Sequence, residues 1–359
     1  MDENLDFVKV AKIKVIGVGG GGNNAVNRMV TDGVKGVDFY VANTDAQVLK
    51  GITGVNKIFL GRDITQGLGA GGNPEIGRKA AQESENEIRE ALADANMVFV
   101  AAGMGGGTGT GGAPVVAKIA RDLGALTVGV VTSPFTFEGP RRKRQAFAGL
   151  EELRKNVDSI IVVSNDRLLE VIGNRPMNEA FREADNILRQ SVQTITDLIA
   201  IPAMINLDFA DVSSVMKDRG DALIGIGMAE GENKAQEAAK RAVSSPLLDV
   251  SINGAKDAIV NITGGPSMSL FEASEAFATI TEAIGNDVNA IMGVASNDQL
   301  DDQIIVTIIA TGFEEDQPEE EEVVVTPKQT YTVHGNKTTT VVEDDDEDPL
   351  PGFIRNRKI

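Results

Sequence analysis

The chain has 359 residues and a formal net charge of −19 at pH 7, and 42% of its residues are hydrophobic. Its length predicts two compact domains plus a tail, and its strong negative charge argues against nucleic acid as a partner. There is no cysteine for disulfides or thiol chemistry, and the single histidine, His334, lies in a polar tail, which excludes histidine-based acid–base chemistry from the core. No apolar run reaches the length of a membrane span, and Met1–Asn4 does not begin a signal peptide, so we expect a cytosolic protein without direct membrane insertion.

The first predicted unit is an apolar strand, Ile13–Val18, followed by a glycine-rich turn and a helix through Met29. Gly17, Gly19 and Gly22 satisfy the pattern G-x-G-x-x-G, which is typical of a dinucleotide-binding unit when it lies between a strand and a helix. The next strand, 37–42, is followed by an acid at the place of a ribose-binding carboxylate. A nicotinamide oxidoreductase is therefore one hypothesis for the function.

A second glycine loop spans Gly67–Gly72 and precedes Asn73 and Pro74. Asparagine is a good helix N-cap and proline a good first-turn residue, so we expect a helix from Pro74 to about Ala93. Glycine loops that recur between strands and helices favour a shared ligand at the carboxyl edge of a sheet.

The most informative stretch is Gly103–Gly112, which lies between an apolar strand, 97–102, and a helix expected to open at Pro114. Glycines let backbone N–H groups converge without obstruction, and Thr108 and Thr110 add hydroxyl donors. Converging amides beside a helix N-terminus bind anions, so the expected ligand is a chain of phosphates. No lysine follows the glycines, so this is not a Walker-type P-loop.

Two further strands, 126–131 and 160–163, complete a strand–helix alternation that predicts a doubly wound, mostly parallel α/β sheet. Between them, a loop with Glu138 leads into the basic cluster Arg141–Arg144, of which at least one arginine is expected to face phosphate. Asn165 follows the last strand. Its amide could read a purine edge or cap a helix, and the sequence leaves both open.

A long helix is predicted over Asn178–Ile201, with an apolar residue at every third or fourth position, and Pro202 ends it. This apolar stripe contains Phe181, Ala184, Leu188, Val192, Ile195 and Ile199.

A short polar segment follows, in which Asn206, Asp208 and Asp211 place an amide and two carboxylates within six residues. Asp211 could simply cap the next helix. A divalent-metal site is a second possibility, although two carboxylates supply few ligands.

The C-terminal half predicts a smaller α+β domain with a mixed sheet. Its expected strands are 222–228, 258–263, 286–294 and 303–311, with helices over 233–243 and 268–284. The predicted organisation is a flexible arm (1–11), a nucleotide-binding domain (12–177), a central helix (178–203), a C-terminal domain (204–313), an acidic linker (314–348) and a terminal peptide (349–359).

The linker carries thirteen acidic residues against two lysines, a composition that cannot bury a core and predicts disorder. The terminal peptide reverses the sign of the charge and combines apolar with basic residues. An apolar, basic end on a flexible tether is typical of a docking peptide.

The spacing of these candidates suggests a site shared by two chains. If the purine lies near Asn165 and Asp185, the helix from Asp185 to Ile201 runs about 24 Å away from it. Asp208 and Asp211 lie still further along the chain, so they would reach the nucleotide of a neighbouring subunit more easily than their own. A head-to-tail contact of this kind builds a filament when it does not close.

The segment Gly105–Gly111 reads GGGTGTG, and with it the chain resembles the tubulin and FtsZ family over roughly residues 12–312. The terminal peptide matches FtsZ as well. The positions that match the family's GTP contacts are Gly20, Gly21, Gly22, Asn23, Asn24, Gly71, Gly72, Gly107, Thr108, Gly109, Glu138, Arg142, Asn165 and Asp185. Asn206, Asp208 and Asp211 match its activating loop, with Ala203-Met204 in place of the family's Gly-Leu.

The resemblance implies a GTPase that uses GTP, GDP and Mg²⁺, polymerises head to tail and forms the division ring at mid-cell beneath the inner membrane. It also implies that Pro351, Phe353, Ile354 and Arg355 bind membrane-tethering and regulatory division proteins. Besides the oxidoreductase, a non-catalytic nucleotide-binding scaffold remains an alternative. The intact residues of the activating loop argue against such a scaffold.

Overall fold

A computed structural model describes residues 11–313, apart from 174–175, 201–203, 206, 246–251 and 286. Ten strands in the described ranges form one sheet, in the order β3-β2-β1-β4-β5-β6-β7-β10-β8-β9. The strands are β1 (Ile13–Val18), β2 (Val37–Asn43), β3 (Asn56–Phe59), β4 (Met97–Gly103), β5 (Leu126–Ser133), β6 (Ser159–Ser164), β7 (Gly220–Ala229), β8 (Asp257–Gly264), β9 (Asn289–Ser296) and β10 (Ile304–Thr311). The predicted acidic linker and terminal peptide, and residues 1–10 of the arm, lie outside the described residues.

The first six strands are parallel, and helices cover both of their faces, which confirms the predicted doubly wound sheet. The helices of this half are α1 (Gly19–Thr31), α2 (Ala46–Gly51), α3 (Arg62–Thr65), α4 (Pro74–Glu83), α5 (Glu85–Leu92), α6 (Thr108–Asp122), α7 (Pro140–Arg154), α8 (Asn165–Ile172) and α9 (Met177–Ala200). Successive strand residues alternate between the faces: Val15 packs in the cluster with α1 and α9, and Ile16 in the cluster with α4 to α7. Because the six strands are parallel, their carboxyl ends lie at the same edge of the sheet.

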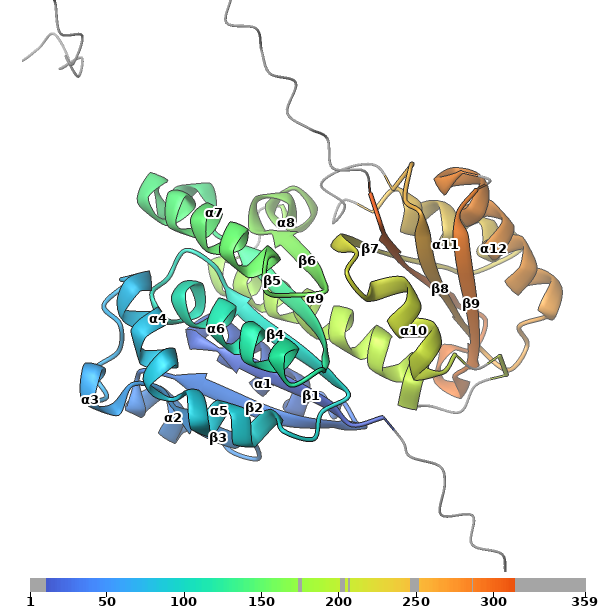
Figure 1. Cartoon of the computed structure of the whole chain (residues 1–359). Coiled ribbons are helices and arrows are strands. Elements are labelled where there is room, and N and C mark those ends of the chain that lie inside the picture. The colour runs from blue at the N-terminus through green and yellow to red at the C-terminus, as the bar shows by residue number, and fades with distance from the viewer. Residues whose placement is uncertain are drawn as a thin grey trace, which may run out of the picture. The chain divides into compact units, whose positions relative to one another are not determined.

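The second half continues the same sheet with mixed strand directions, as expected for an α+β domain. β7 pairs with β6 in parallel over three residues, while β10 is antiparallel to both β7 and β8. The helices are α10 (Phe209–Met216), α11 (Lys234–Val243) and α12 (Leu270–Ile284), with short 3-10 turns η1 (Thr136–Glu138) and η2 (Asp298–Leu300). Figure 1 shows α9 leading from the first group of strands to α10. No helix in the described ranges is both long and apolar enough to cross a membrane.

Two predicted helices differ from the structure by more than two residues at one end or are interrupted. The helix expected from Pro74 to Ala93 breaks at Ser84, whose hydroxyl accepts a hydrogen bond from Gly61 N (3.0 Å) and donates to Phe59 O (3.2 Å). A side chain that bonds backbone groups elsewhere competes with the regular helix at this point.

The second difference concerns the glycine-rich stretch. α6 begins at Thr108 rather than at Pro114, so Pro114 lies inside the helix. The helix can form through glycines because close packing supports it: a Cβ on Gly111 would lie only 1.9 Å from Pro74 O of α4. The Gly–Thr segment is therefore the helix N-terminus itself, and its first amides lie directly at the sheet edge.

Candidate functional site

The three glycine loops meet at the carboxyl edge of the first six strands. A Cβ on Gly19 would lie 2.6 Å from Gly109 N, and a Cβ on Gly107 would lie 2.9 Å from Asn73 N. Real Cβ atoms do not approach backbone this closely, so each loop requires glycine in order to pack against the next. This geometry agrees with the expectation that the three glycine loops lie together at the carboxyl edge of the sheet.

Two glycines of this edge have no such packing role. A Cβ on Gly20 or on Gly106 would meet no protein atom within 4 Å, and neither residue has a positive φ. Neither close packing nor backbone conformation therefore calls for glycine at these positions. A ligand that approaches the backbone closely does call for it.

The first turn of α6 is built as an anion site. Its N–H groups have no partner of the usual helical kind, and the helix dipole favours negative charge at this end. Gly105 N donates to Thr110 Oγ1 at 2.8 Å, and the Thr108 hydroxyl lies 2.7 Å from that of Thr44. Thr44, which the sequence did not single out, therefore positions the hydroxyl of Thr108.

Asn23 and Asn24 lie at the same edge in different environments. Asn23 is fully buried; its side chain donates to Gly17 O and accepts from Asn43 Nδ2 at 2.8 Å. It therefore supports the loop from within the protein. Asn24 is exposed and free to face a ligand.

Glu138 and Arg142 form an ion pair at the start of α7. Glu138 also accepts from Phe135 N at 3.0 Å, and its side chain is only 13% exposed, whereas that of Arg142 is 54% exposed. The carboxylate thus anchors the guanidinium, which remains accessible to an anion at the edge.

Asn165 begins α8, but it does not cap that helix. Ser164 is the N-cap and accepts from Arg167 N. Asn165 is 5% exposed, and its Oδ1 has no hydrogen-bond partner within the described part of the chain. A buried amide oxygen without a partner is costly, and the N–H of a bound base would satisfy it.

Asp185 and Phe181 lie four residues apart on α9, so they share a face of the helix. Burial raises the pKa of Asp185 to about 6, and the nearby Arg28 offsets part of this effect. Phe181, the first residue of the predicted apolar stripe, is 41% exposed and packs edge-on against Phe135, which stacks on Phe137. The spacing to Asp185 is the signal that could have revealed this aromatic face.

The segment that resembles the family's activating loop, residues 204–211 and called the activating loop below, ends in two carboxylates that form a capping box at the start of α10. Asp208 is the N-cap and accepts from Asp211 N at 2.9 Å, while Asp211 accepts from Asp208 N at 3.0 Å. Asp208, rather than Asp211, is therefore the cap. Within the described residues, the second oxygen of each carboxylate takes no hydrogen bond. Asn206 and Ala203 lie outside the described residues.

The activating loop lies at the edge opposite the glycine loops. Phe209 and Ser213 of α10 line a cavity of about 570 Å³ together with Asn96 and Leu126, at the amino ends of β4 and β5. α9, with its 24 residues, is about 36 Å long, with Phe181 in its first two turns and this loop beyond its C-terminal end. One chain therefore presents the glycine loops and the two carboxylates at different edges.

Other acidic residues offer little for a metal or a ribose. Among the described residues, no three acids or histidines converge as metal ligands. Asp45, the acid placed where a ribose-binding carboxylate would lie, instead caps α2 and accepts from Gln47 N at 2.8 Å and from Val48 N.

Comparison with known proteins accounts for both halves. Residues 12–173 match the Tubulin/FtsZ family, GTPase domain, and residues 220–314 match the FtsZ family, C-terminal domain. An FtsZ from M. jannaschii, solved as an empty dimer, is 44% identical, with a TM-score of 0.81 over 84% of this chain and 88% of that one.

More distant relatives share the fold. CetZ2 and CetZ1 from Haloferax volcanii are 23% and 20% identical, each with a TM-score of 0.72 over 85% of this chain, and over 94% and 95% of their own. They were solved as a GTPγS-bound protofilament and a GDP-bound monomer.

The sheet edge where the three glycine loops meet, together with the match over residues 12–173, thus defines a GTPase domain of the tubulin type. With both domains matched and a close FtsZ structure over most of its length, the chain belongs to the FtsZ family. This membership replaces the oxidoreductase hypothesis.

Proposed function

We propose that this chain binds GTP at the edge formed by its glycine loops, assembles head to tail, and hydrolyses GTP where two subunits meet. The main support is that the glycine loops and the carboxylates of Asp208 and Asp211 lie at opposite edges of one chain. Only a second copy can bring these two parts of the site together. The FtsZ of M. jannaschii, 44% identical, was solved as a dimer.

The phosphates would lie against Gly20–Gly22, Gly71–Gly72 and the first turn of α6, with Arg142 as a positive contact. The base would lie near Asn165, Asp185 and Phe181: the unpaired oxygen of Asn165 and the carboxylate of Asp185 accept N–H groups, and Phe181 offers a ring for stacking. Guanine, with the ring N1–H and the exocyclic 2-amino group side by side on one edge, fits two such acceptors.

From the next subunit, Asp208 and Asp211 would orient and polarise the attacking water through their free oxygens, and Asn206 would support them. No acidic cluster among the described residues holds a metal by itself. Mg²⁺ would therefore be held by the phosphates and water, and it would offset negative charge on the phosphates.

Exposed apolar side chains at both edges support a head-to-tail contact. Leu68 is 85% exposed and Phe137 60% exposed beside the glycine loops, while Met204 is 66% exposed at the activating loop. Apolar surface of this kind is typical of interfaces. We infer further that the filaments form the division ring at mid-cell beneath the inner membrane, and that Pro351, Phe353, Ile354 and Arg355 bind membrane-tethering partners.

Assembly-dependent hydrolysis predicts a threshold in protein concentration. With GTP and Mg²⁺, we expect phosphate release per molecule to be near zero in dilute protein and to rise steeply at the concentration where light scattering begins. A scaffold would scatter light without releasing phosphate. A specific activity independent of concentration would contradict the shared site.

The raised pKa of Asp185 predicts a pH dependence of nucleotide affinity. The ionised side chain of Asp185 can accept two N–H groups of the base, whereas the protonated side chain cannot. Nucleotide binding therefore favours the deprotonated form of Asp185, and nucleotide affinity is lost as pH falls through the pKa. With a pKa of about 6, GDP affinity should fall about fourfold between pH 7.5 and pH 5.5. Isothermal titration calorimetry measures this.

Asp185→Asn is the matched control for the pH series, because the titration of the nucleotide phosphates affects both proteins equally. The variant should bind more weakly at pH 7.5, and it should lack the additional fourfold loss. Equal pH profiles for the two proteins would exclude Asp185 as the base contact.

A further inference from the structure

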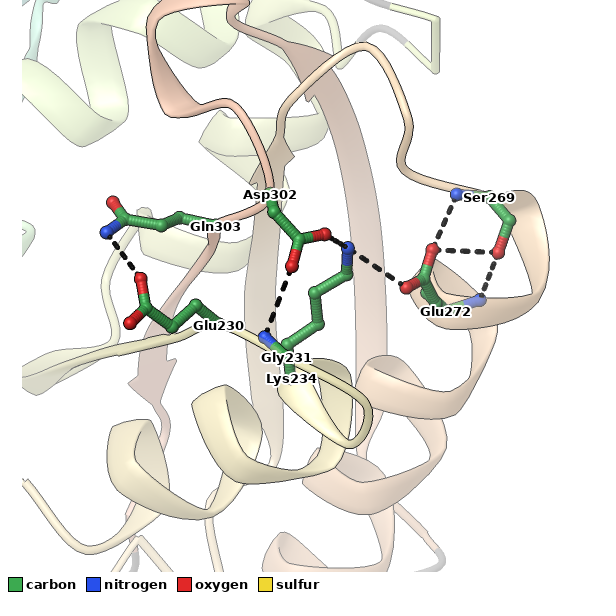
Figure 2. A network of polar contacts seen from close by, with 7 residues as sticks. All are labelled: Glu230, Gly231, Lys234, Ser269, Glu272, Asp302 and Gln303. Carbon is green, nitrogen blue, oxygen red and sulfur yellow. Dashed lines mark hydrogen bonds and ion pairs between the residues drawn. The ribbon is translucent and has the colours of Figure 1, made fainter.

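A buried lysine connects three segments of the C-terminal domain. Lys234, the first residue of α11, is 6% exposed, and its Nζ lies 2.5 Å from Asp302 Oδ1 and 3.3 Å from Glu272 Oε1 (Figure 2). Asp302 also accepts from Gly231 N at 3.3 Å. A buried ammonium requires such partners, and a missing partner leaves an uncompensated charge.

The two acids belong to different elements. Glu272 lies in the first turn of α12, where it forms a capping box with Ser269: Ser269 N donates to Glu272 Oε2 at 2.7 Å, and Glu272 N donates to Ser269 Oγ at 3.2 Å. Asp302 lies in the turn 297–303 between β9 and β10. One ammonium therefore links the starts of α11 and α12 to this turn, as Figure 2 shows.

The turn 297–303 has a tightly defined conformation. Asp301 has a φ of +46°, and a Cβ on Gly265 would lie 1.8 Å from Asp301 O. Asn297 N donates to Gly264 O at 2.9 Å. A non-glycine residue in the left-handed region persists only when its surroundings hold it there. The contact of Lys234 with the next residue, Asp302, is one of these restraints.

The activating loop is hydrogen-bonded to β9, the strand that precedes the turn 297–303. Met204 N donates to Val294 O at 2.9 Å, and Val294 N donates to Ile205 O at 3.2 Å. Val294 lies two residues before the end of β9, where the turn 297–303 follows. The first turn of α12 adds two exposed apolar residues at this edge, Leu270 and Phe271, which are 72% and 76% exposed.

We propose that Lys234 is a positioning residue for self-assembly. It holds the turn 297–303 and the start of α12 in the conformation in which this edge of the C-terminal domain docks onto the nucleotide edge of a second copy. The inference rests on the proposed head-to-tail assembly and deepens it. The partner is another copy of this chain, because the network adjoins the loop that the proposed assembly places against the next nucleotide.

Without the ammonium, Glu272 and Asp302 repel each other without compensation. Asp302 is 65% exposed in its side chain, so it can turn toward water and release the turn without unfolding the domain. The glycine loops lie at the starts of other elements, α1, α4 and α6, and keep their structure. The expected defect is therefore in assembly, with nucleotide binding by the monomer unchanged.

The experiment compares the full chain with Lys234→Met, Lys234→Arg and Asp302→Asn. Lys240→Met is the control, since Lys240 is exposed on the same helix and its loss changes the net charge equally. We expect Lys234→Met to bind GDP like the wild type and to raise the critical concentration for assembly at least about tenfold. Arginine should restore assembly, Asp302→Asn should raise the critical concentration, and Lys240→Met should not.

Mixing separates a positioning role from general loss of structure. Lys234→Met keeps its nucleotide edge, so it should join one end of a wild-type filament and block further growth there, and small amounts should lower wild-type polymer. An unfolded protein would not do this. If Lys234→Met does not bind GDP, the test of the proposal is Asp302→Asn. Assembly of Asp302→Asn at the critical concentration of the wild type would then overturn the proposal.

Normal assembly by Lys234→Met likewise overturns the proposal while leaving the proposed function intact. Failure of the wild-type chain to assemble with GTP would instead remove the proposed function. The two failures are therefore distinguishable in one set of sedimentation measurements.

Discussion

Asp208→Asn is expected to lower steady-state GTP turnover at least about 100-fold, the lower range for loss of a positioned acid–base group. Asparagine caps helices as well as aspartate does, so α10 keeps its N-cap bond to Asp211 N. The variant loses only the negative charge that would polarise the water. Nucleotide binding should not change, because the glycine loops lie at the opposite edge.

Phosphate release and GDP affinity, measured on the same preparation, check this expectation. Asp208→Ala is the less specific variant, because it also removes the cap at a cost of about 1 kcal/mol. Thermal unfolding of both variants separates the two effects. Wild-type turnover in Asp208→Asn would exclude this carboxylate from catalysis.

Gly20→Ala is expected to weaken GTP binding at least about tenfold without changing the melting temperature. The new methyl group meets no protein atom within 4 Å, and Gly20 does not need a positive φ. The methyl would instead occupy the space proposed for phosphate, where backbone must approach closely. Binding is measured by calorimetry and stability by thermal unfolding.

Two other glycines serve as controls. Gly51→Ala, at the end of α2, also adds a methyl in open space without a positive φ, so it should change neither binding nor stability. Gly111→Ala would place its Cβ 1.9 Å from Pro74 O, so it should destabilise the fold itself. Unchanged GTP affinity in Gly20→Ala would show that the phosphates lie elsewhere.

The parallel sheet follows from the sequence because its strands are apolar runs bounded by glycine and polar residues. Ile13–Val18 and Asn73, the cap of α4, lie where the patterns predict. Their signals are local: hydrophobicity, helix capping and turn chemistry act within a few residues. The glycine loops are equally visible, since few segments besides turns and ligand loops use so many glycines.

The differences arise where distant contacts decide the local structure. β3, with four residues, has no periodic signal of its own and forms by pairing with β2. Ser84 breaks a helix through bonds to Gly61 and Phe59, some 23 and 25 residues earlier. α6 extends through glycines because α4 packs against it. None of these partners can be read from the local pattern.

The candidate site shows the same division. The carboxylates of the activating loop and the glycine loops are visible as motifs, and the length of the long helix between them predicts that they lie far apart. The unpaired oxygen of Asn165 and the exposed ring of Phe181 become apparent only when burial is known. Lys234 carries no motif, and only the fold brings it to Glu272 and Asp302.

The shared site is tested most directly by mixing Asp208→Asn with Gly20→Ala. The first variant binds GTP but lacks one acid of the activating loop, while the second binds GTP weakly but carries the intact loop. When Gly20→Ala presents its loop to the nucleotide of Asp208→Asn, phosphate release should rise well above the sum of the two separate rates. A mixture that releases phosphate only at that sum would contradict hydrolysis between subunits.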